Sequence, residues 1–407
     1  MFNRCDRSPV AELLPEASFY LYLAEGWSVL IVLLTRSLMK RSALFFLLAL
    51  VCFCVRAQDA QLEAAKKKLQ SADFAGAKTA LSAIIDANPK NKAAFILRGQ
   101  AKAGLQDFYG AIGDFNFALE ADSTLSEALN YRGESKMALG DDEGAILDFD
   151  KAIRHNAKYT AAYTNRGLAK YNIEDLQGAY FDFSKALELG PPDADKYFNR
   201  GVAKAELGEF ISAIDDYTKA IQLDAKDPDL FNYRGVAYYN TGNMDQAIAD
   251  YNESIKLDPK NGQTYENRAL ARGAKENYKE ALEDYNKAVE LDPEEAETLN
   301  LRGVTKYNLD DHDGAIADYT KAISIDDTNP VYFDNRALSK TEKGDLAGAV
   351  EDYTSSIELY PNDAETYYQR ALVKLQMNNN YDACLDLKRA EELGSVEAKA
   401  TMKKSCK

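Results

Sequence analysis

Histidine is almost absent from this sequence, and its scarcity limits the chemistry that the protein can perform. The chain of 407 residues has two histidines, His155 and His312, which lie in separate parts of the sequence. No histidine-based metal site or nucleophile–base pair can be assembled from them. There is also no glycine-rich phosphate loop after a strand, and no convincing strand. We therefore expect a protein that is not an enzyme and that binds no cofactor, metal ion or small-molecule substrate.

Positive charge is also in short supply. Lys and Arg number 49 against 65 Asp and Glu, which gives a formal net charge of −16. This balance excludes the positively charged footprint that nucleic-acid binding requires. An acidic surface favours basic partners, but it can equally serve only to keep a protein soluble.

What the sequence has in abundance is repetition, and one unit shows the pattern best. In residues 228–261, PDLFNYRGVAYYNTGNMDQAIADYNESIKLDPKN, small and aromatic side chains recur at helical spacing in two stretches. Gly235 and Tyr239 share a stripe of the first stretch, and Ala247 and Tyr251 share a stripe of the second. Turn-forming residues separate the stretches, and Pro259 ends the second because proline has no amide proton. The unit is predicted to be a helical hairpin.

Ten copies of this 34-residue unit follow one another without a gap. They cover residues 58–91, 92–125, 126–159, 160–193, 194–227, 228–261, 262–295, 296–329, 330–363 and 364–397. Position 20 of the unit is alanine in every copy: Ala77, Ala111, Ala145, Ala179, Ala213, Ala247, Ala281, Ala315, Ala349 and Ala383. A single hairpin cannot bury its apolar stripe on both sides, so the copies are expected to stack on one another.

Two further positions are complementary in size, because one holds a small residue and the other a large aromatic residue. Position 8 is glycine or alanine in copies two to ten, and position 24 is phenylalanine or tyrosine in copies two to nine. A glycine inside a helix costs about 1 kcal/mol relative to alanine. Its recurrence predicts that another backbone approaches too closely for a larger side chain. The aromatic residue at position 24 is predicted to fill the remaining space.

With small residues at positions 8, 20 and 27, an aromatic residue at 24 and proline at 32 in five copies, residues 58–397 resemble the tetratricopeptide repeat (TPR) family. The resemblance implies an all-α fold, an α-solenoid in which antiparallel helix pairs wind into a right-handed superhelix. It also implies a concave groove, lined mainly by first helices, that holds peptides or protein segments. It does not identify the partner.

A charged pair departs from the usual family pattern, in which position 7 is apolar. Position 7 is arginine and position 23 is aspartate in copies two to ten: Arg98 and Asp114, Arg132 and Asp148, Arg166 and Asp182, Arg200 and Asp216, Arg234 and Asp250, Arg268 and Asp284, Arg302 and Asp318, Arg336 and Asp352, Arg370 and Asp386. In the first copy both are replaced together, by Ala64 and Ala80. If arginine paired with the aspartate of the preceding copy, Arg98 would have no partner, and if it paired with that of the following copy, Asp114 would have none. Pairing inside each hairpin leaves neither residue without a partner. We predict nine ion pairs that join first helix to second; the alternative is a basic stripe for anionic ligands.

By the same resemblance, positions 2, 5, 6, 9, 12 and 13 face the groove. Positions 12 and 13 are tyrosine and asparagine in alternate copies, with a period of 68 residues: Tyr171 and Asn172, Tyr239 and Asn240, Tyr307 and Asn308. Tyrosine offers broad contact at low entropic cost, and asparagine both donates and accepts hydrogen bonds, so these residues are predicted to hold an extended peptide. Inherited duplication without selected binding would leave the same pattern. Position 6 adds a partial series similar to the asparagine ladder of glycosyltransferase-associated TPR superhelices: Asn165, Asn199, Asn267 and Asn335.

The N-terminal residues have the parts of a secretory signal. A basic cluster within residues 39–41 precedes an apolar run at 43–55, and Ala57 offers a small residue for cleavage. The run is too short to span a bilayer comfortably. We expect residues 39–57 to be a signal peptide, and residues 1–38 to be a misassigned upstream start or a disordered extension. An uncleaved signal, the alternative, would be the chain's only contact with a membrane.

Export would leave two of the five cysteines, Cys384 and Cys406, in an oxidising compartment. A disulfide between them, worth roughly 3 kcal/mol, would hold a C-terminal capping helix at residues 398–407 over the last repeat. Cys384 occupies a position that is isoleucine in several other copies, so a free cysteine that fills the core is the alternative.

The sequence thus predicts an exported, non-catalytic scaffold that binds protein or peptide segments, in the periplasm or cell envelope of a two-membrane bacterium. Two other interpretations remain open. One is an accessory or assembly subunit of an envelope, cell-wall or secretion enzyme complex. The other is a cytosolic TPR regulator, which requires that the apolar run at 43–55 is not a signal.

Overall fold

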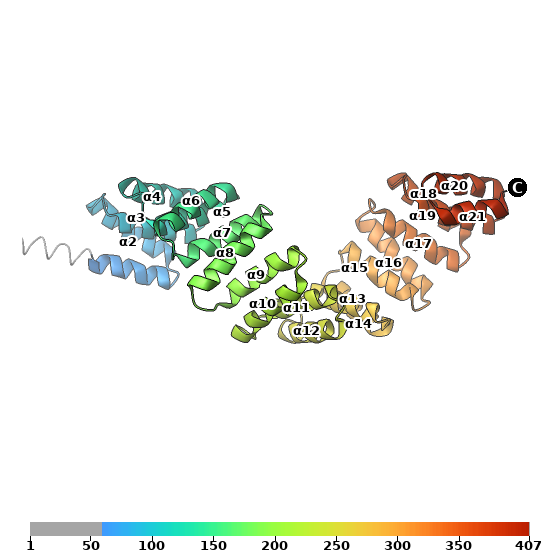
Figure 1. The fold of residues 1–407 in the computed structure, drawn as a ribbon, viewed down its shortest axis with the longest axis horizontal. Coiled ribbons are helices and arrows are strands. Elements are labelled where there is room, and N and C mark those ends of the chain that lie inside the picture. The colour runs from blue at the N-terminus through green and yellow to red at the C-terminus, as the bar shows by residue number, and fades with distance from the viewer. Residues whose placement is uncertain (1–58, 407) are drawn as a thin grey trace, which may run out of the picture. The chain divides into compact units, whose positions relative to one another are not determined.

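The computed structural model describes residues 59–406, and every regular element among them is a helix (Figure 1). The signal peptide and upstream extension expected at residues 1–57 lie outside the described residues. The described residues divide into two compact units, 59–155 and 156–406. None of the helices in the described part is long and apolar enough to cross a membrane.

In the first unit a helix at residues 59–70 precedes α2 (Phe74–Ala87), α3 (Lys92–Gly104), α4 (Phe108–Ala121), α5 (Ser126–Met137) and α6 (Asp142–His155). The second unit contains α7 (Thr160–Asn172), α8 (Leu176–Leu189), α9 (Ala194–Glu206), α10 (Phe210–Leu223), α11 (Pro228–Asn240), α12 (Met244–Leu257), α13 (Gly262–Ala274), α14 (Tyr278–Leu291), α15 (Ala296–Tyr307), α16 (His312–Ile325), α17 (Pro330–Glu342), α18 (Leu346–Leu359), α19 (Ala364–Gln376), α20 (Asn380–Glu392) and α21 (Val396–Ser405). From α3 to α20, odd numbers mark the first helix of a hairpin and even numbers the second.

The turn inside each hairpin depends on one residue in the left-handed conformation. This residue is glycine in some hairpins, such as Gly242 at φ 78°, and another residue elsewhere, such as Glu276 at φ 62°. After α11, the Gly242 amide donates to the Tyr239 carbonyl and the Asn243 amide donates to the Tyr238 carbonyl, both at 2.9 Å. These bonds satisfy the last carbonyl groups of the first helix and end it.

Many of the second helices begin at an aspartate that caps the helix. The carboxylate of Asp345 accepts a hydrogen bond from the Gly348 amide at 3.1 Å. A Cβ atom on Gly348 would lie 2.4 Å from that carboxylate, so this cap geometry favours glycine three residues later. Where the cap residue is Glu209, Asn243 or Asn277, no side-chain cap bond forms and the third residue is not glycine. In the second helices the aspartate cap and the glycine therefore occur together, whereas Asn379 caps α20 through the Asp382 amide without a glycine.

The core of each hairpin combines a buried alanine with a large side chain. The alanine at position 20 is completely buried in all ten copies. A Cβ atom on Gly235 would lie 2.6 Å from the ring of Tyr251, which is position 24 of the same hairpin. The expectation of a close backbone at position 8 is therefore wrong. The aromatic ring itself occupies the volume that a side chain at this position would need.

Neighbouring hairpins share these cores. Ala213 and Tyr217 on α10 cluster with Ala237 on α11, the first helix of the next hairpin. The same arrangement recurs between α12 and α13. Second helices pack against the following first helices within each unit. Each unit is thus an all-α solenoid of tandem helix pairs, in which no hairpin completes its core alone.

The last helix, α21, closes the second unit. It begins at Val396, two residues before the expected 398, because the Ser395 hydroxyl caps it by accepting a hydrogen bond from the Ala398 amide at 3.1 Å. Ala398 is fully buried, and Met402 packs against the core of the tenth hairpin. The helix covers the apolar surface of the tenth hairpin.

Candidate functional site

The arginines at position 7 and the aspartates at position 23 form ion pairs inside the hairpins. Each of the nine arginines, from Arg98 to Arg370, donates from Nε and Nη2 to both carboxylate oxygens of the aspartate 16 residues later, at 2.5–2.9 Å. The aspartate side chains are at most 9% exposed. This bidentate geometry fixes the first helix against the second.

In most hairpins a second cation binds the same aspartate, which was not predicted from the sequence. Lysine at position 11 binds the same carboxylate in seven hairpins, at 2.7–2.9 Å. Arg272 takes this role in the seventh copy at 2.7 Å. In the sixth copy the position holds Tyr238, so Arg234 is the single cation bound to Asp250 within the described residues. The sequence does contain a signal for this second cation, because positions 7 and 11 are one helical turn apart and therefore lie on the same side of the first helix.

The bonds to the aspartates occupy the arginines inside the fold. Burial by itself raises the pKa of Asp216, but hydrogen bonds from Arg200 and Lys204 outweigh it and hold the pKa below its ordinary value. Arginine Nη1 also reaches the preceding hairpin, as from Arg234 to the Thr218 hydroxyl at 3.0 Å. The guanidinium groups thus join helices and hairpins, which argues against a basic stripe for anionic ligands.

We call positions 2, 5, 6, 9, 12 and 13 of α7, α9, α11, α13, α15, α17 and α19 the first-helix face. These positions form one stripe along each helix. The three predicted tyrosines on it, Tyr171, Tyr239 and Tyr307, are all partly exposed. Tyr171 and Tyr239 also pack against the cores of their hairpins, which orients the rings.

The asparagines that follow these tyrosines, Asn172, Asn240 and Asn308, are exposed. The Nδ2 atom of Asn240 donates to the Val236 carbonyl at 2.9 Å, and that of Asn308 donates to the Val304 carbonyl at 2.8 Å. This bond uses an amide proton and fixes the side chain at the end of its own helix. The carbonyl oxygen of the asparagine is an acceptor that the bond does not use.

The position-6 asparagines pair across neighbouring first helices. Asn267 Nδ2 donates to Asn232 Oδ1 at 3.0 Å, and Asn335 Nδ2 donates to Asn300 Oδ1 at 2.8 Å. Their partners are therefore asparagines at position 5 of the preceding copy, and not one another as in a simple ladder. The remaining position-6 asparagines are partly buried on α7 and α9: Asn165 and Asn199.

The first-helix face carries charge of one sign. None of its six positions in α7 to α19 holds Lys, Arg or His. Eight carry carboxylates: Asp195, Glu206, Asp229, Glu266, Glu297, Asp334, Glu342 and Glu365. The net charge of the whole chain does not predict this distribution, because it averages the face with all other surfaces.

Two cavities are lined in part by residues of this face, at an interval of two repeats. One of 320 Å³ lies between α13 and α15 and is lined by Glu266 and Thr298. The other, of 220 Å³, lies between α17 and α19 and is lined by Asp334 and Thr366. The Thr298 hydroxyl donates to the Glu266 carboxylate, and the Thr366 hydroxyl donates to Asp334 Oδ2 at 3.2 Å. The two cavities therefore share one design, with a position-5 carboxylate and a position-3 threonine.

The Asp334 carboxylate receives hydrogen bonds only from hydroxyl groups, and no cation binds it within the described residues. Its Oδ1 atom is buried and has no hydrogen-bond partner within the described residues. Thr366 has one hydroxyl proton and also lies 2.8 Å from Asp363 Oδ2, which competes for it. Burial raises the pKa of Asp334 to about 6, although the hydroxyls of Ser356 and Thr366 oppose the shift.

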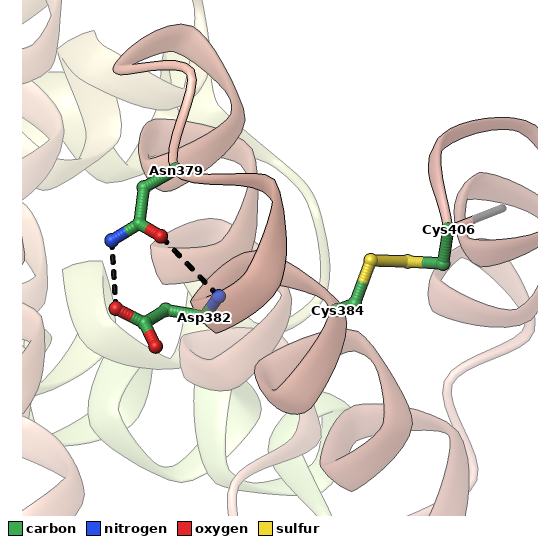
Figure 2. Close-up of a disulfide and its surroundings, with 4 residues drawn as sticks. All are labelled: Asn379, Asp382, Cys384 and Cys406. Carbon is green, nitrogen blue, oxygen red and sulfur yellow. Dashed lines mark hydrogen bonds between the residues drawn. A yellow bond between two sulfur atoms is a disulfide. The ribbon is translucent and has the colours of Figure 1, made fainter.

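A disulfide joins Cys384 on α20 to Cys406, which follows α21 (Figure 2). The two Cα atoms are 5.8 Å apart, and 22 residues separate the cysteines in sequence. Asn379 caps α20 one turn before Cys384, accepting from the Asp382 amide and donating to its carboxylate. The bond fastens the closing helix to the last hairpin.

Comparison with known families decides the class of protein. Family models described as tetratricopeptide repeat match residues 62–126, 228–261 and 296–329, and one described as TPR repeat matches residues 203–242 and 272–310. The chain is a tetratricopeptide repeat protein. No curated protein matches this TPR protein.

Several solved structures resemble the TPR protein. YrrB, described as a TPR protein with an unusual peptide-binding site, is 23% identical over 46% of this chain and 95% of its own, with a TM-score of 0.42. The C-terminal part of a TPR repeat-containing protein from Cytophaga hutchinsonii is 22% identical over 58% of this chain and 97% of its own, with a TM-score of 0.49. A TPR protein from Parabacteroides merdae is 20% identical over 61% and 99%, with a TM-score of 0.45.

TPR proteins are scaffolds that are typically not catalytic. In the described part of this one, no group of three or more metal-ligating side chains is arranged to hold a metal ion. The features that stand out are instead the tyrosine–asparagine pairs, the cavities and the acidic charge of the first-helix face.

Proposed function

We propose that this TPR protein is an exported scaffold that binds an extended peptide or protein segment along the first-helix face, without catalysing a reaction. The observation that carries the proposal is the recurrence of partly exposed tyrosine beside exposed asparagine on α7, α11 and α15. Each pair presents the same chemistry at an interval of two repeats. A ligand with a repeating backbone can meet such a series of contacts.

The geometry of the asparagines suits a peptide backbone. Asn240 and Asn308 are held by bonds to Val236 and Val304, so their carbonyl oxygens are fixed before a ligand arrives. Each oxygen can accept from a backbone N–H of an extended segment. The neighbouring tyrosine rings supply contact area and lose little conformational freedom, because they already pack on the hairpin.

Replacement of the three tyrosines tests this proposal. The probes are fluorescent synthetic peptides of equal length with basic, neutral, acidic or apolar side chains, and binding is measured by fluorescence polarisation. Tyr171→Ala, Tyr239→Ala and Tyr307→Ala together should weaken the tightest peptide about tenfold or more, equivalent to about 1.4 kcal/mol. A matched variant replaces exposed tyrosines outside the face: Tyr109, Tyr360 and Tyr381. It should leave binding unchanged.

Two results would reject peptide binding on this face. One is that no peptide of the panel binds the folded protein. The other is that both triple variants weaken binding equally. Thermal unfolding of both variants checks that each remains folded.

Export is supported by two independent features. Residues 39–57 have the order of a cleavable signal, and the Cys384–Cys406 disulfide is a bond that persists in oxidising compartments. We expect the mature protein to begin at Gln58 and to show no free thiol when denatured without reductant. N-terminal sequencing that finds Met1, together with free thiols at both cysteines, would favour the cytosolic interpretation.

A further inference from the structure

The charge of the first-helix face is unbalanced, because its own positions carry only carboxylates while the nearby arginines and lysines are used inside the hairpins. The arginines at position 7 and most of the lysines at position 11 are paired with buried aspartates on the hairpin interior. The first-helix face has carboxylates without a single Lys, Arg or His at its own positions in α7 to α19. Six of those carboxylates belong to exposed residues, which include Glu206, Asp229 and Glu342.

We propose that the segment bound on the first-helix face is rich in lysine or arginine, and that one cationic side chain enters the cavity beside Asp334. This inference rests on the proposed function and identifies the chemistry of its partner. Positive charge on an extended segment is complementary to a surface that carries only negative charge.

The charge of the cavity between α17 and α19 is complementary to such a cationic side chain. Its lining carries three carboxylates, Asp334, Asp363 and Glu365, and no cation. The donors that serve them are all neutral: the hydroxyls of Ser356 and Thr366 at Asp334, the Glu365 backbone amide at Asp363 at 3.0 Å, and the Gln369 amide at Glu365 at 2.6 Å. An ammonium group has three donors and a guanidinium group five, and either supplies the positive charge that this lining lacks.

The size and apolar lining of this cavity also fit one side chain. Its volume of 220 Å³ lies below the range of about 300–1,000 Å³ typical of small-molecule sites. Leu338 and Tyr353 line it beside the carboxylates. They offer apolar contact to the methylene groups of a lysine or arginine stem while the charged end reaches the acids.

The second cavity extends the same recognition along the face. Glu266 stands 68 residues before Asp334 and Thr298 the same interval before Thr366, which is also the interval between Tyr239 and Tyr307. Its lining includes Asp292 and Glu295, with Lys260 as its single base. Two cationic side chains on one segment would therefore meet equivalent sites two repeats apart.

Peptide binding to the full chain tests the inference. The probes are three synthetic peptides of equal length that alternate serine with lysine, glutamine or glutamate. The double variant Glu266→Gln and Asp334→Asn should weaken the lysine peptide about tenfold. The matched control is Glu283→Gln with Glu351→Gln, which changes exposed residues on α14 and α18 of the same two hairpins by the same charge. It should change the affinity less than about twofold, because screened surface charges contribute little.

Each outcome separates this inference from the proposed function. Equal or tighter binding of the glutamine or glutamate peptide overturns the basic partner and leaves peptide binding intact. Equal weakening by both double variants also overturns it, because binding would then follow net charge and not the cavities. Failure of every peptide, including the wider panel used for the tyrosine variants, rejects the proposed function itself.

Discussion

At the scale of single residues, Asp334 is the ionisable group with the clearest effect on the pH dependence of stability. Its pKa lies at about 6 in the folded protein against an ordinary 3.8, because burial disfavours the charged form. Between these two pH values the unfolded chain releases the proton while the folded chain keeps it. The free energy of unfolding therefore falls as pH rises through this window and stays lower above it.

Asp334→Asn should remove this pH dependence. At pH 8 the variant should be more stable than the wild type by up to about 3 kcal/mol, since one pKa unit corresponds to about 1.36 kcal/mol. Below pH 4 the two proteins should be equally stable. Urea unfolding at both pH values, followed by hydrogen exchange of α17 and α19, measures the difference. Asp334 would be ruled out as the source of the pH dependence if Asp334→Asn were no more stable than the wild type at pH 8. The same conclusion would follow if Glu351→Gln had an equal effect on stability.

Single residues also show where sequence reasoning stops. Small residues at position 8 can be recognised as a packing requirement, but whether a backbone or a ring imposes it depends on the three-dimensional path of position 24. Gly235 and Tyr251 are 16 residues apart in sequence and touch only because the hairpin closes. Asp334 could not be singled out from the sequence. Its Oδ1 atom has no hydrogen-bond partner within the described residues because of how α17 and α19 pack around the cavity.

At the scale of the hairpin, the buried aspartate acts as the junction of two helices. Asp216 binds Arg200 and Lys204 from one side of α9, and its side chain is 1% exposed. Asp250 binds Arg234 from α11, and the lysine position is occupied by Tyr238. A buried carboxylate that keeps one cation after a mutation should be far less costly than one that keeps none.

The fifth and sixth hairpins therefore form a matched pair for mutation. Arg234→Met should destabilise the sixth hairpin by about 3–5 kcal/mol, because Asp250 is left buried without a cation. Arg200→Met should cost clearly less, because Lys204 remains. Native-state hydrogen exchange of α12 and α10 reads each hairpin separately, which is necessary because long repeat arrays do not always unfold as one unit.

Adding Asp250→Leu to Arg234→Met should restore much of the lost stability, since both charges are then removed. Equal costs of Arg234→Met and Arg200→Met would contradict the role assigned to the second cation.

The hairpin is also the scale at which the sequence is most informative. Arginine and aspartate disappear together in the first copy, at Ala64 and Ala80, and this co-occurrence is enough to assign partners within one hairpin. The lysine at position 11 escapes the same argument because arginine or tyrosine replaces it in two copies. The hydrogen bonds from arginine to the preceding hairpin depend on how copies stack, which the sequence of one copy does not contain.

At the scale of the whole molecule, each hairpin depends on its neighbours in the chain. Cores such as that of Ala213, Tyr217 and Ala237 join consecutive copies, so a strict sequence period is enough to predict a solenoid of helix pairs. The surface is less constrained. Copies differ at the positions of the first-helix face, and that variation distributes the tyrosines, carboxylates and cavities from which function is inferred.

The central claim is that a peptide segment lies along the first-helix face of residues 156–407. Photo-crosslinking tests it most directly, with a benzophenone amino acid placed at Tyr239 or Tyr307 on the face, and at Tyr360 or Tyr381 as exposed positions outside it. With the tightest peptide of the panel, the account predicts crosslinks at Tyr239 and Tyr307 that unlabelled peptide competes away. Crosslinks confined to Tyr360 and Tyr381, or equal at all four positions, would contradict it.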